Sequence, residues 1–211
     1  GRTMIQQTFD RIRKIVPVEN IYVITNKEYI ALTAEQLPEV NSENIVGEPM
    51  MKNTAACNIY MAKKIAAKNS EANMIVLPAD HLILKENDFL ETIKIGLDFV
   101  EKNDSLLTLG IKPSRPETGY GYIQISDGET NLRKVKTFTE KPNAELAQVF
   151  FETGEFFWNS GIFLWNLQTI DKAFDTLLPE VATKFKAGTE FFNTPKEQGF
   201  IDEMYPSCPN I

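Results

Sequence analysis

The stretch that decides the fold is MIVLPADHLI, residues 74–83, in which an apolar run ends at Pro78 and is followed by Asp80 and His81. The run is too short for a typical helix, so it predicts a strand buried on both faces, as in a parallel α/β sheet. Ligands bind at the carboxyl ends of such strands, which makes Asp80 a candidate metal or phosphate-site residue. The alternative is that Asp80 caps the next turn or forms an Asx turn.

Helical periodicity and apolar runs alternate on both sides of this stretch. The pattern predicts helices at residues 1–16 and 27–37 and from residues 53 and 87, and strands at 21–25, 45–46, 74–78 and 106–111. This α, β, α, β order predicts a largely parallel sheet. Asn53 is expected to cap its helix, and Asp88 with Glu91 forms a capping pair for the next helix.

The pattern changes after residue 111. Residues 112–125 read as a Pro- and Gly-rich loop followed by an alternating strand, and residues 134–142 as a second alternating strand. Together they predict antiparallel additions to the parallel sheet. Asn143 is expected to cap a helix that ends at Gly154.

The segment FFWNSGIFLW, residues 156–165, is apolar except at its centre, where Asn159 and Gly161 flank a serine. One interpretation is a bulge or tight bend between two short strands, to which Gly161 is suited. The other is a backbone that approaches a ligand closely, with Asn159 offering both a donor and an acceptor to a hydroxyl group.

Composition limits the class of protein. The 211 residues predict one domain, and the net charge of −7 argues against a nucleic-acid or anionic-membrane surface. The apolar runs fall short of the roughly 18 residues that a membrane span needs, and no signal-peptide pattern opens the chain, so a cytoplasmic location is predicted. Two distant cysteines and one histidine favour free thiols and disfavour histidine-based metal or nucleophile chemistry.

Polar residues follow several of the predicted apolar elements, and in a doubly wound sheet they could converge on one edge. This group consists of Asn53 with Thr54, Asp80, Glu140 with Lys141, and Asn159 with Gly161. Asparagine and glutamate can bridge sugar hydroxyls, lysine can meet a phosphate, and aspartate can hold magnesium. The mixture suits a nucleotide and a phosphorylated sugar better than a peptide.

Five ordered motifs across nearly the whole chain resemble the mannose-1-phosphate guanylyltransferase family. They are EP..KNTA at residues 48–55, PADH at 78–81, PETGYGYI at 116–123, FTEKP at 138–142 and FFWNSGIFLW at 156–165. The resemblance implies a Rossmann-like nucleotidyltransferase domain, with a mixed, mostly parallel sheet flanked by helices and antiparallel additions in the sugar-binding half. It also implies synthesis of GDP-mannose and pyrophosphate from GTP and mannose 1-phosphate, with Mg²⁺.

The same resemblance implies roles for individual residues. The nucleotide-binding set would be Glu48, Asn53, Thr54, Pro78 and Asp80, with Asp80 also a magnesium ligand. The substrate-binding set would be Gly119, Tyr120, Gly121, Glu140, Lys141, Asn159 and Gly161. Asp80 and Lys141 are the expected catalytic residues. No general base is needed, because the second pKa of a phosphate monoester is about 6 and the attacking group is mostly ionised at neutral pH.

The chain also departs from the family pattern. The family's glycine-rich phosphate loop normally precedes a segment like residues 1–12, and its second metal-binding aspartate follows a stretch like residues 205–211. We therefore expect a single domain, residues 1–211, that lacks both ends and is inactive alone. Met50-Met51-Lys52 stands where the family often has a glycine and an arginine, which weakens an anion site there.

Two alternative functions stay open. One is a related thymidylyl- or uridylyltransferase acting on another sugar phosphate. The other is a non-catalytic sugar-nucleotide-binding subunit. A homodimer is an open possibility for the assembly.

Overall fold

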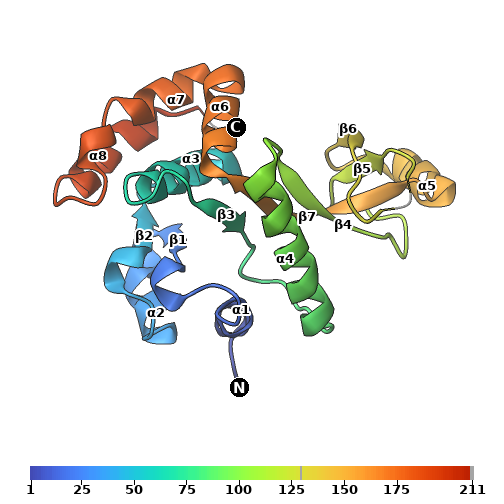
Figure 1. The fold of residues 1–211 in the computed structure, drawn as a ribbon, viewed down its shortest axis with the longest axis horizontal. Helices are drawn as coiled ribbons and strands as arrows, with labels where there is room; N and C mark the ends of the chain where they lie inside the picture. The colour runs from blue at the N-terminus through green and yellow to red at the C-terminus, as the bar shows by residue number, and fades with distance from the viewer. Residues whose placement is uncertain (129, 210–211) are drawn as a thin grey trace. The chain divides into compact units, whose positions relative to one another are not determined.

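The computed structural model describes residues 1–128 and 130–209, which divide into two compact units (Figure 1). Unit 1 comprises Gly1–Leu106 with Leu164–Ile211, and unit 2 comprises Leu107–Phe163. The prediction of a single domain stays a prediction, because two compact units can belong to one domain. None of the helices in the described ranges is long and apolar enough to cross a bilayer.

Unit 1 is built mainly of helices. The α-helices are α1 (Met4–Ile12), α2 (Ile30–Gln36), α3 (Asn53–Ala66), α4 (Glu86–Lys102), α6 (Leu167–Leu177), α7 (Pro179–Lys186) and α8 (Glu197–Met204). Short 3₁₀ helices are η1 (Val18–Asn20), η2 (Lys27–Tyr29), η3 (Ser42–Asn44), η4 (Thr189–Phe191) and η5 (Tyr205–Ser207). Of the irregular end predicted after Met204, residues 210 and 211 lie outside the described residues.

The strands lie in two sheets rather than in the one sheet that was predicted. In the first, β1 (Val23–Asn26) pairs in parallel with β2 (Ile45–Glu48). The second has the order β3-β7-β5-β6, with β4 also paired to β7. Its strands are β3 (Asn73–Val76), β4 (Leu107–Ile111), β5 (Tyr122–Ile125), β6 (Val135–Thr139) and β7 (Phe156–Asn166).

The core of unit 1 joins the first sheet to the helices around it. Phe9, Leu37, Val40 and Ile45 form a buried cluster that brings α1 and the segment after α2 against β2. A second, aromatic group centres on Tyr60 of α3, whose ring lies 6.2 Å from that of Phe185 and 6.3 Å from that of Tyr205. Burial of such large rings stabilises the packing of the C-terminal helices on α3.

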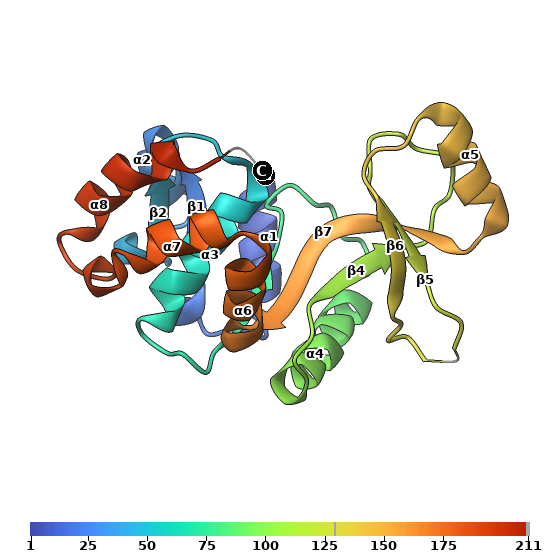
Figure 2. The same ribbon diagram turned by 90° about the horizontal axis from the view of Figure 1, so that it is seen from above.

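Unit 2 is the antiparallel part of the chain, as predicted. Strand β5 pairs antiparallel with both β6 and β7. Helix α5 (Ala144–Thr153) lies beside these strands (Figure 2). Its Ala147 and Phe150 form a buried cluster with Tyr122 and Trp158. Asn143 caps α5 by accepting a hydrogen bond from the N–H of Leu146, and Gly154 ends the helix with a positive φ of 70°.

Several local predictions were wrong. Asn53 is the first residue of α3 rather than its N-cap, and it has a positive φ of 60°. Helix α4 begins at Glu86, before the predicted cap Asp88, and its N-cap Lys85 makes no side-chain capping bond. The first helix ends at Ile12, well before Pro17, because a short turn intervenes.

The two elements around residues 45–52 and 156–165 also differ from the prediction. Strand β2 extends through Gly47 to Glu48, because its parallel pairing with β1 continues to that residue. Strand β7 runs from Phe156 to Asn166 without a break, although Gly161 inside it has a φ of 71°. Glycine adopts this conformation without the steric cost that a Cβ atom would add.

Candidate active site

Asp80 lies in the loop after β3. Side chains of α1 donate hydrogen bonds to the residues immediately before and after it. The hydroxyl of Thr8 donates to the carbonyl oxygen of Ala79 at 3.3 Å, and Nη2 of buried Arg11 donates to the carbonyl oxygen of His81 at 3.4 Å. The backbone on either side of Asp80 is therefore anchored.

The carboxylate of Asp80 itself is exposed and is not hydrogen bonded to any described residue. The capping and Asx-turn alternatives both need a bond from this carboxylate to a backbone N–H, so neither is formed. An anchored aspartate with a free carboxylate can bind a divalent cation. Within residues 1–128 and 130–209, no three acidic, histidine or cysteine side chains cluster as a metal site. Asp80 therefore supplies one oxygen ligand of the kind that would hold such a cation.

The loop between β2 and α3 carries the other predicted nucleotide-binding residues. Glu48 ends β2, and its Oε2 accepts a 2.6 Å hydrogen bond from the hydroxyl of Tyr205. Asn53 and Thr54 begin α3 with exposed side chains, and no side chain caps this helix. The first N–H groups of an uncapped helix are available to an anion or a polar base. No hydrogen bond among the described residues joins this loop to Asp80.

The two thiols are not activated as nucleophiles by their surroundings. Cys57 and Cys208 are both free. Burial, and then the charge of Glu48, raise the pKa of Cys57 to about 11. A thiol with this pKa is protonated at neutral pH and is a poor nucleophile.

In unit 2, the loop before β5 is fixed by its own side chains. The carboxylate of Glu117 accepts hydrogen bonds from the N–H of Gly119 and from the guanidinium of Arg115. The backbone N–H of Glu117 donates to the hydroxyl of Tyr122, and the ring of Tyr120 lies 5.3 Å from that of Trp158. These contacts order the loop that contains Gly119, Tyr120 and Gly121.

Three of the predicted substrate-binding residues come together in unit 2. The carbonyl oxygen of Gly121 accepts a 2.7 Å hydrogen bond from the backbone N–H of Asn159. A Cβ atom built on Gly121 would lie 2.8 Å from Oε2 of Glu140. The carboxylate of Glu140 and the backbone of Asn159 therefore both border Gly121, and the missing Cβ atom leaves the space that the carboxylate occupies. A carboxylate and an amide on either side of a glycine can receive the hydroxyls of a sugar.

Lys141 follows this cluster at the turn after β6. Its φ of 41° is uncommon for a residue other than glycine, and its side chain is 64% exposed. Its Nζ lies 3.6 Å from Oε1 of the equally exposed Glu140. Exposed pairs of this kind contribute little stability, so the lysine can exchange this partner for a phosphate.

Asn159 shows a contact that the sequence did not predict. Its Oδ1 lies 2.8 Å from Oγ1 of Thr108 in β4 and accepts from the N–H of Gly161 at 3.3 Å. The N–H of Gly161 therefore helps to hold the Asn159 side chain, and its positive φ shapes the backbone of β7. Thr108 lies inside the apolar run of residues 106–111, and its polar side chain is the one sequence signal that distinguishes it there.

The predicted residues thus fall into two groups that are each ordered within one unit. The nucleotide set of Glu48, Asn53, Thr54, Pro78 and Asp80 lies in unit 1. The substrate set from Gly119 to Gly161 lies in unit 2.

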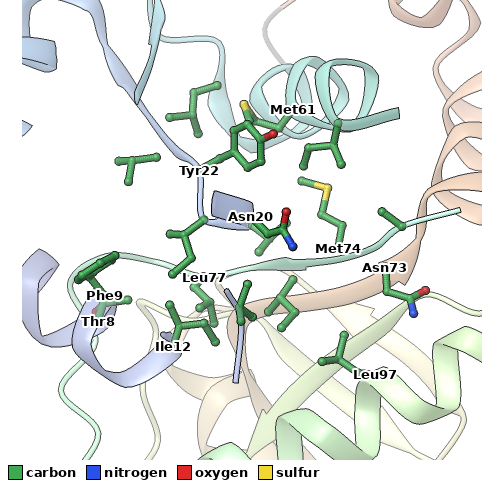
Figure 3. Close-up of a pocket in the computed structure, with 18 of the residues that line it drawn as sticks. Thr8, Phe9, Ile12, Asn20, Tyr22, Met61, Asn73, Met74, Leu77 and Leu97 are labelled. Atoms are coloured by element: carbon green, nitrogen blue, oxygen red, sulfur yellow. The ribbon is translucent and has the colours of Figure 1, made fainter. Parts of the chain in front are cut away.

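Unit 1 also contains a cavity of about 590 Å³ with a mostly apolar lining (Figure 3). Strands β1 and β3 both contribute to its wall, and among the described strands each of them pairs with one neighbour. Its labelled lining residues include Phe9, Ile12, Tyr22, Met61, Met74 and Leu97. None of the predicted nucleotide-binding residues is among those that line it.

Comparisons with known proteins identify the family of this chain. A family model described as nucleotidyl transferase matches residues 1–190. A mannose-1-phosphate guanylyltransferase from Escherichia coli is 34% identical over 219 residues, which cover 98% of this chain and 46% of that protein. Another, from Escherichia coli strain K12, is 40% identical over 163 residues, which cover 73% of this chain and 34% of that protein. The chain thus spans about half or less of the length of these relatives.

Solved structures show the same fold. The crystal structure of a mannose-1-phosphate geranyltransferase from Thermus thermophilus matches with a TM-score of 0.87 and 25% identity, covering all of this chain and 59% of that one. That of a mannose-6-phosphate isomerase from Helicobacter pylori matches with a TM-score of 0.75 and 26% identity, covering 89% of this chain and 72% of that one. The α/β fold, with parallel and antiparallel strands, is therefore of the nucleotidyltransferase type.

Proposed function

Because the chain belongs to the nucleotidyl transferase family, we propose that it acts in the transfer of a guanylyl group from GTP to mannose 1-phosphate. The products would be GDP-mannose and pyrophosphate. The cluster of Gly121, Glu140 and Asn159 carries the proposal, because three separate sequence motifs supply it and unit 2 brings them together. In the same proposal, β1, β2 and their helices belong to a Rossmann-like nucleotide-binding half.

The chemistry needs alignment and neutralisation of charge rather than a proton relay. A phosphate oxygen of mannose 1-phosphate would attack the α-phosphorus of GTP, and the bond from that phosphorus to the leaving pyrophosphate would break. The attacking oxygen is already ionised at neutral pH, so no side chain has to remove a proton. Positioning and electrostatic stabilisation then supply most of the catalysis.

Each predicted group has a part in this scheme. Glu140 and Asn159 would bind sugar hydroxyls, and Lys141 would meet the sugar phosphate. Enzymes of this family generally use a divalent metal. We propose Mg²⁺ held by Asp80, where it would neutralise phosphate charge when bound. Glu48, Asn53 and Thr54 would lie near the guanine nucleotide. The cytoplasmic location and the homodimer stay predictions of the sequence.

Calorimetric titration of this chain tests the proposal directly. We expect mannose 1-phosphate to bind, with an affinity that falls at least tenfold in Glu140→Gln, because the carboxylate accepts hydrogen bonds that are stronger than those of an amide. GTP with Mg²⁺ should bind in preference to UTP and dTTP.

Two results would contradict the assignment. A preference for dTTP or UTP would point to the related thymidylyl- or uridylyltransferases. Absence of mannose 1-phosphate binding by the folded protein would refute the sugar half of the proposal. Glu145→Gln, on the first turn of α5, is a matched control that should leave the affinity unchanged.

A further inference from the structure

Thr108 is a half-buried residue of β4 that has no role in the proposed reaction. Its Oγ1 lies 2.8 Å from Oδ1 of Asn159 and 3.1 Å from the carbonyl oxygen of Ile162. All three residues belong to unit 2. The hydroxyl therefore reaches the one side chain on β7 that is expected to contact the sugar.

The contacts fix which way the Asn159 amide points. A backbone N–H can only donate, so the atom of Asn159 that faces the N–H of Gly161 at 3.3 Å must be the amide oxygen. That oxygen cannot donate, so the hydroxyl of Thr108 is the donor, and its single proton is shared between Oδ1 of Asn159 at 2.8 Å and the carbonyl oxygen of Ile162 at 3.1 Å. Both lone pairs of the amide oxygen are then used.

The remaining half of the Asn159 side chain is its NH₂ group. Among the described residues this group has no hydrogen-bond partner, while the backbone N–H of Asn159 is already bonded to Gly121. From the Asn159 side chain, a ligand would therefore meet the two N–H donors of the amide and no free acceptor. The sequence predicted that Asn159 offers a ligand both a donor and an acceptor. In the structure, its side chain offers only the NH₂ donor, because the amide oxygen already accepts two hydrogen bonds.

We propose that Thr108 is a positioning residue that locks the Asn159 amide in its donor orientation, so that Asn159 recognises an acceptor oxygen of the sugar. This inference rests on the proposed function for the identity of the ligand. Without the hydroxyl, the amide oxygen keeps only the longer 3.3 Å contact with the N–H of Gly161, so the amide is held less firmly and rotates more readily about its last torsion. The site would then lose both a fixed donor and the selectivity for an acceptor.

Thr108→Val tests the inference, because valine keeps the shape of threonine and removes only the hydroxyl. We expect the affinity for mannose 1-phosphate to fall about five- to tenfold, the effect of one net hydrogen bond. Thr108→Ser restores the hydroxyl and should bind within about twofold of the wild type. Thr108→Ala, a second variant without the hydroxyl, should repeat the loss if the valine variant folds poorly.

Thr137→Val is the matched control. Thr137 lies on β6 of the same unit, and its hydroxyl also donates to a side-chain amide oxygen, that of Gln124 at 3.3 Å. It is exposed and contacts none of the predicted site residues. Its replacement should leave the affinity unchanged, which separates the loss of any threonine hydroxyl from the loss of this one.

A readout that needs no ligand comes from the side-chain NH₂ resonances of Asn159 in ¹⁵N spectra. Asn159→Asp lacks these resonances and so identifies them. We expect them to move in Thr108→Val and Thr108→Ala, to return in Thr108→Ser, and to stay in place in Thr137→Val. Addition of mannose 1-phosphate to the wild type should shift them.

The two proposals fail differently. If folded wild-type protein does not bind mannose 1-phosphate, the proposed function is wrong, whereas the resonances still show whether Thr108 holds the amide. If the wild type binds and the variants without the hydroxyl keep its affinity and its Asn159 resonances, the role of Thr108 is overturned.

Discussion

At the scale of single residues, Gly121 matters because its lack of a Cβ atom leaves room for neighbouring side chains. A Cβ atom there would meet Oε2 of Glu140 at 2.8 Å and Cζ of Phe138 at 3.0 Å. Both atoms are the far ends of exposed side chains, so they can swing aside. The fold would survive a larger residue, but the carboxylate would leave its place beside residue 121.

We therefore expect Gly121→Ala to weaken mannose 1-phosphate binding about tenfold or more, with a loss of unfolding free energy below about 1 kcal/mol. Calorimetry and urea denaturation measure the two effects. Gly199→Ala is the control, because a Cβ at Gly199 has no atom within 4 Å. Equal affinity of Gly121→Ala and the wild type would show that Glu140 does not need its observed position.

Glu117 gives the loop before β5 a dependence on pH. The hydrogen bond from the N–H of Gly119, and then that from Arg115, lower the pKa of the Glu117 carboxyl. A carboxyl with a lowered folded-state pKa stabilises the fold above its unfolded pKa of about 4.3, and this stabilisation is lost as the pH falls through the folded pKa.

Titration by NMR should therefore place the Glu117 midpoint below about 4.3, with the Gly119 amide resonance moving at the same pH. Arg115→Gln should raise that midpoint, because it removes a charged donor. A Glu117 midpoint at the ordinary value would mean that the two hydrogen bonds are not kept in solution.

The sequence could single out Gly121, Glu140 and Asn159 as candidate residues but could not predict the contacts that orient them. Gly121, Glu140 and Asn159 interrupt or follow apolar strands, and such interruptions are visible in a pattern. Thr108 is a single hydroxyl inside a strand, and its role depends on the pairing of β4 with β7, which no local pattern encodes.

At the scale of elements, α8 is joined to α3 by a buried charged pair. Lys64 and Glu197 lie 2.7 Å apart with side chains that are 8% and 9% exposed. The carboxylate also accepts hydrogen bonds from the hydroxyl of Tyr60 and the backbone N–H of Asn193. Fully partnered in this way, the pair fixes how the two helices pack, whereas loss of one charge would leave the other buried alone.

Glu197→Gln should lower the free energy of unfolding by about 3–5 kcal/mol, measured in urea. Glu180→Gln is the matched control: its i,i+4 partner is Lys184, at 3.0 Å on the surface of α7, and its loss should cost about 0.3–0.5 kcal/mol. Similar losses in the two variants would show that burial does not strengthen the Lys64–Glu197 pair.

Elements were easier to predict than their boundaries. The helical and strand periodicities were right for most of the chain because burial enforces them. The caps at Asn53 and Asp88 were wrong, because a capping pattern competes with the packing of the whole helix, and α4 begins two residues before Asp88.

At the scale of the whole molecule, the proposed function would assign nucleotide recognition to unit 1 and sugar recognition to unit 2. The nucleotide set lies in unit 1 and the sugar set in unit 2, and β7 continues from one unit to the other at Phe163 and Leu164. Both sets stay predictions from the order of motifs along the sequence. That order could not predict that the strands form two sheets, because strand pairing joins residues that are distant in sequence.

The apolar cavity of unit 1 has a consequence for the behaviour of the chain at high concentration. Strands β1 and β3 border it, and each has one neighbouring strand among those described. A strand edge with unpaired N–H and C=O groups is a template for another strand, and an apolar surface beside it favours such pairing. We therefore expect the free edges of β1 and β3 to be the sites at which one molecule pairs with an extended segment of another. Aggregation at high concentration would begin there.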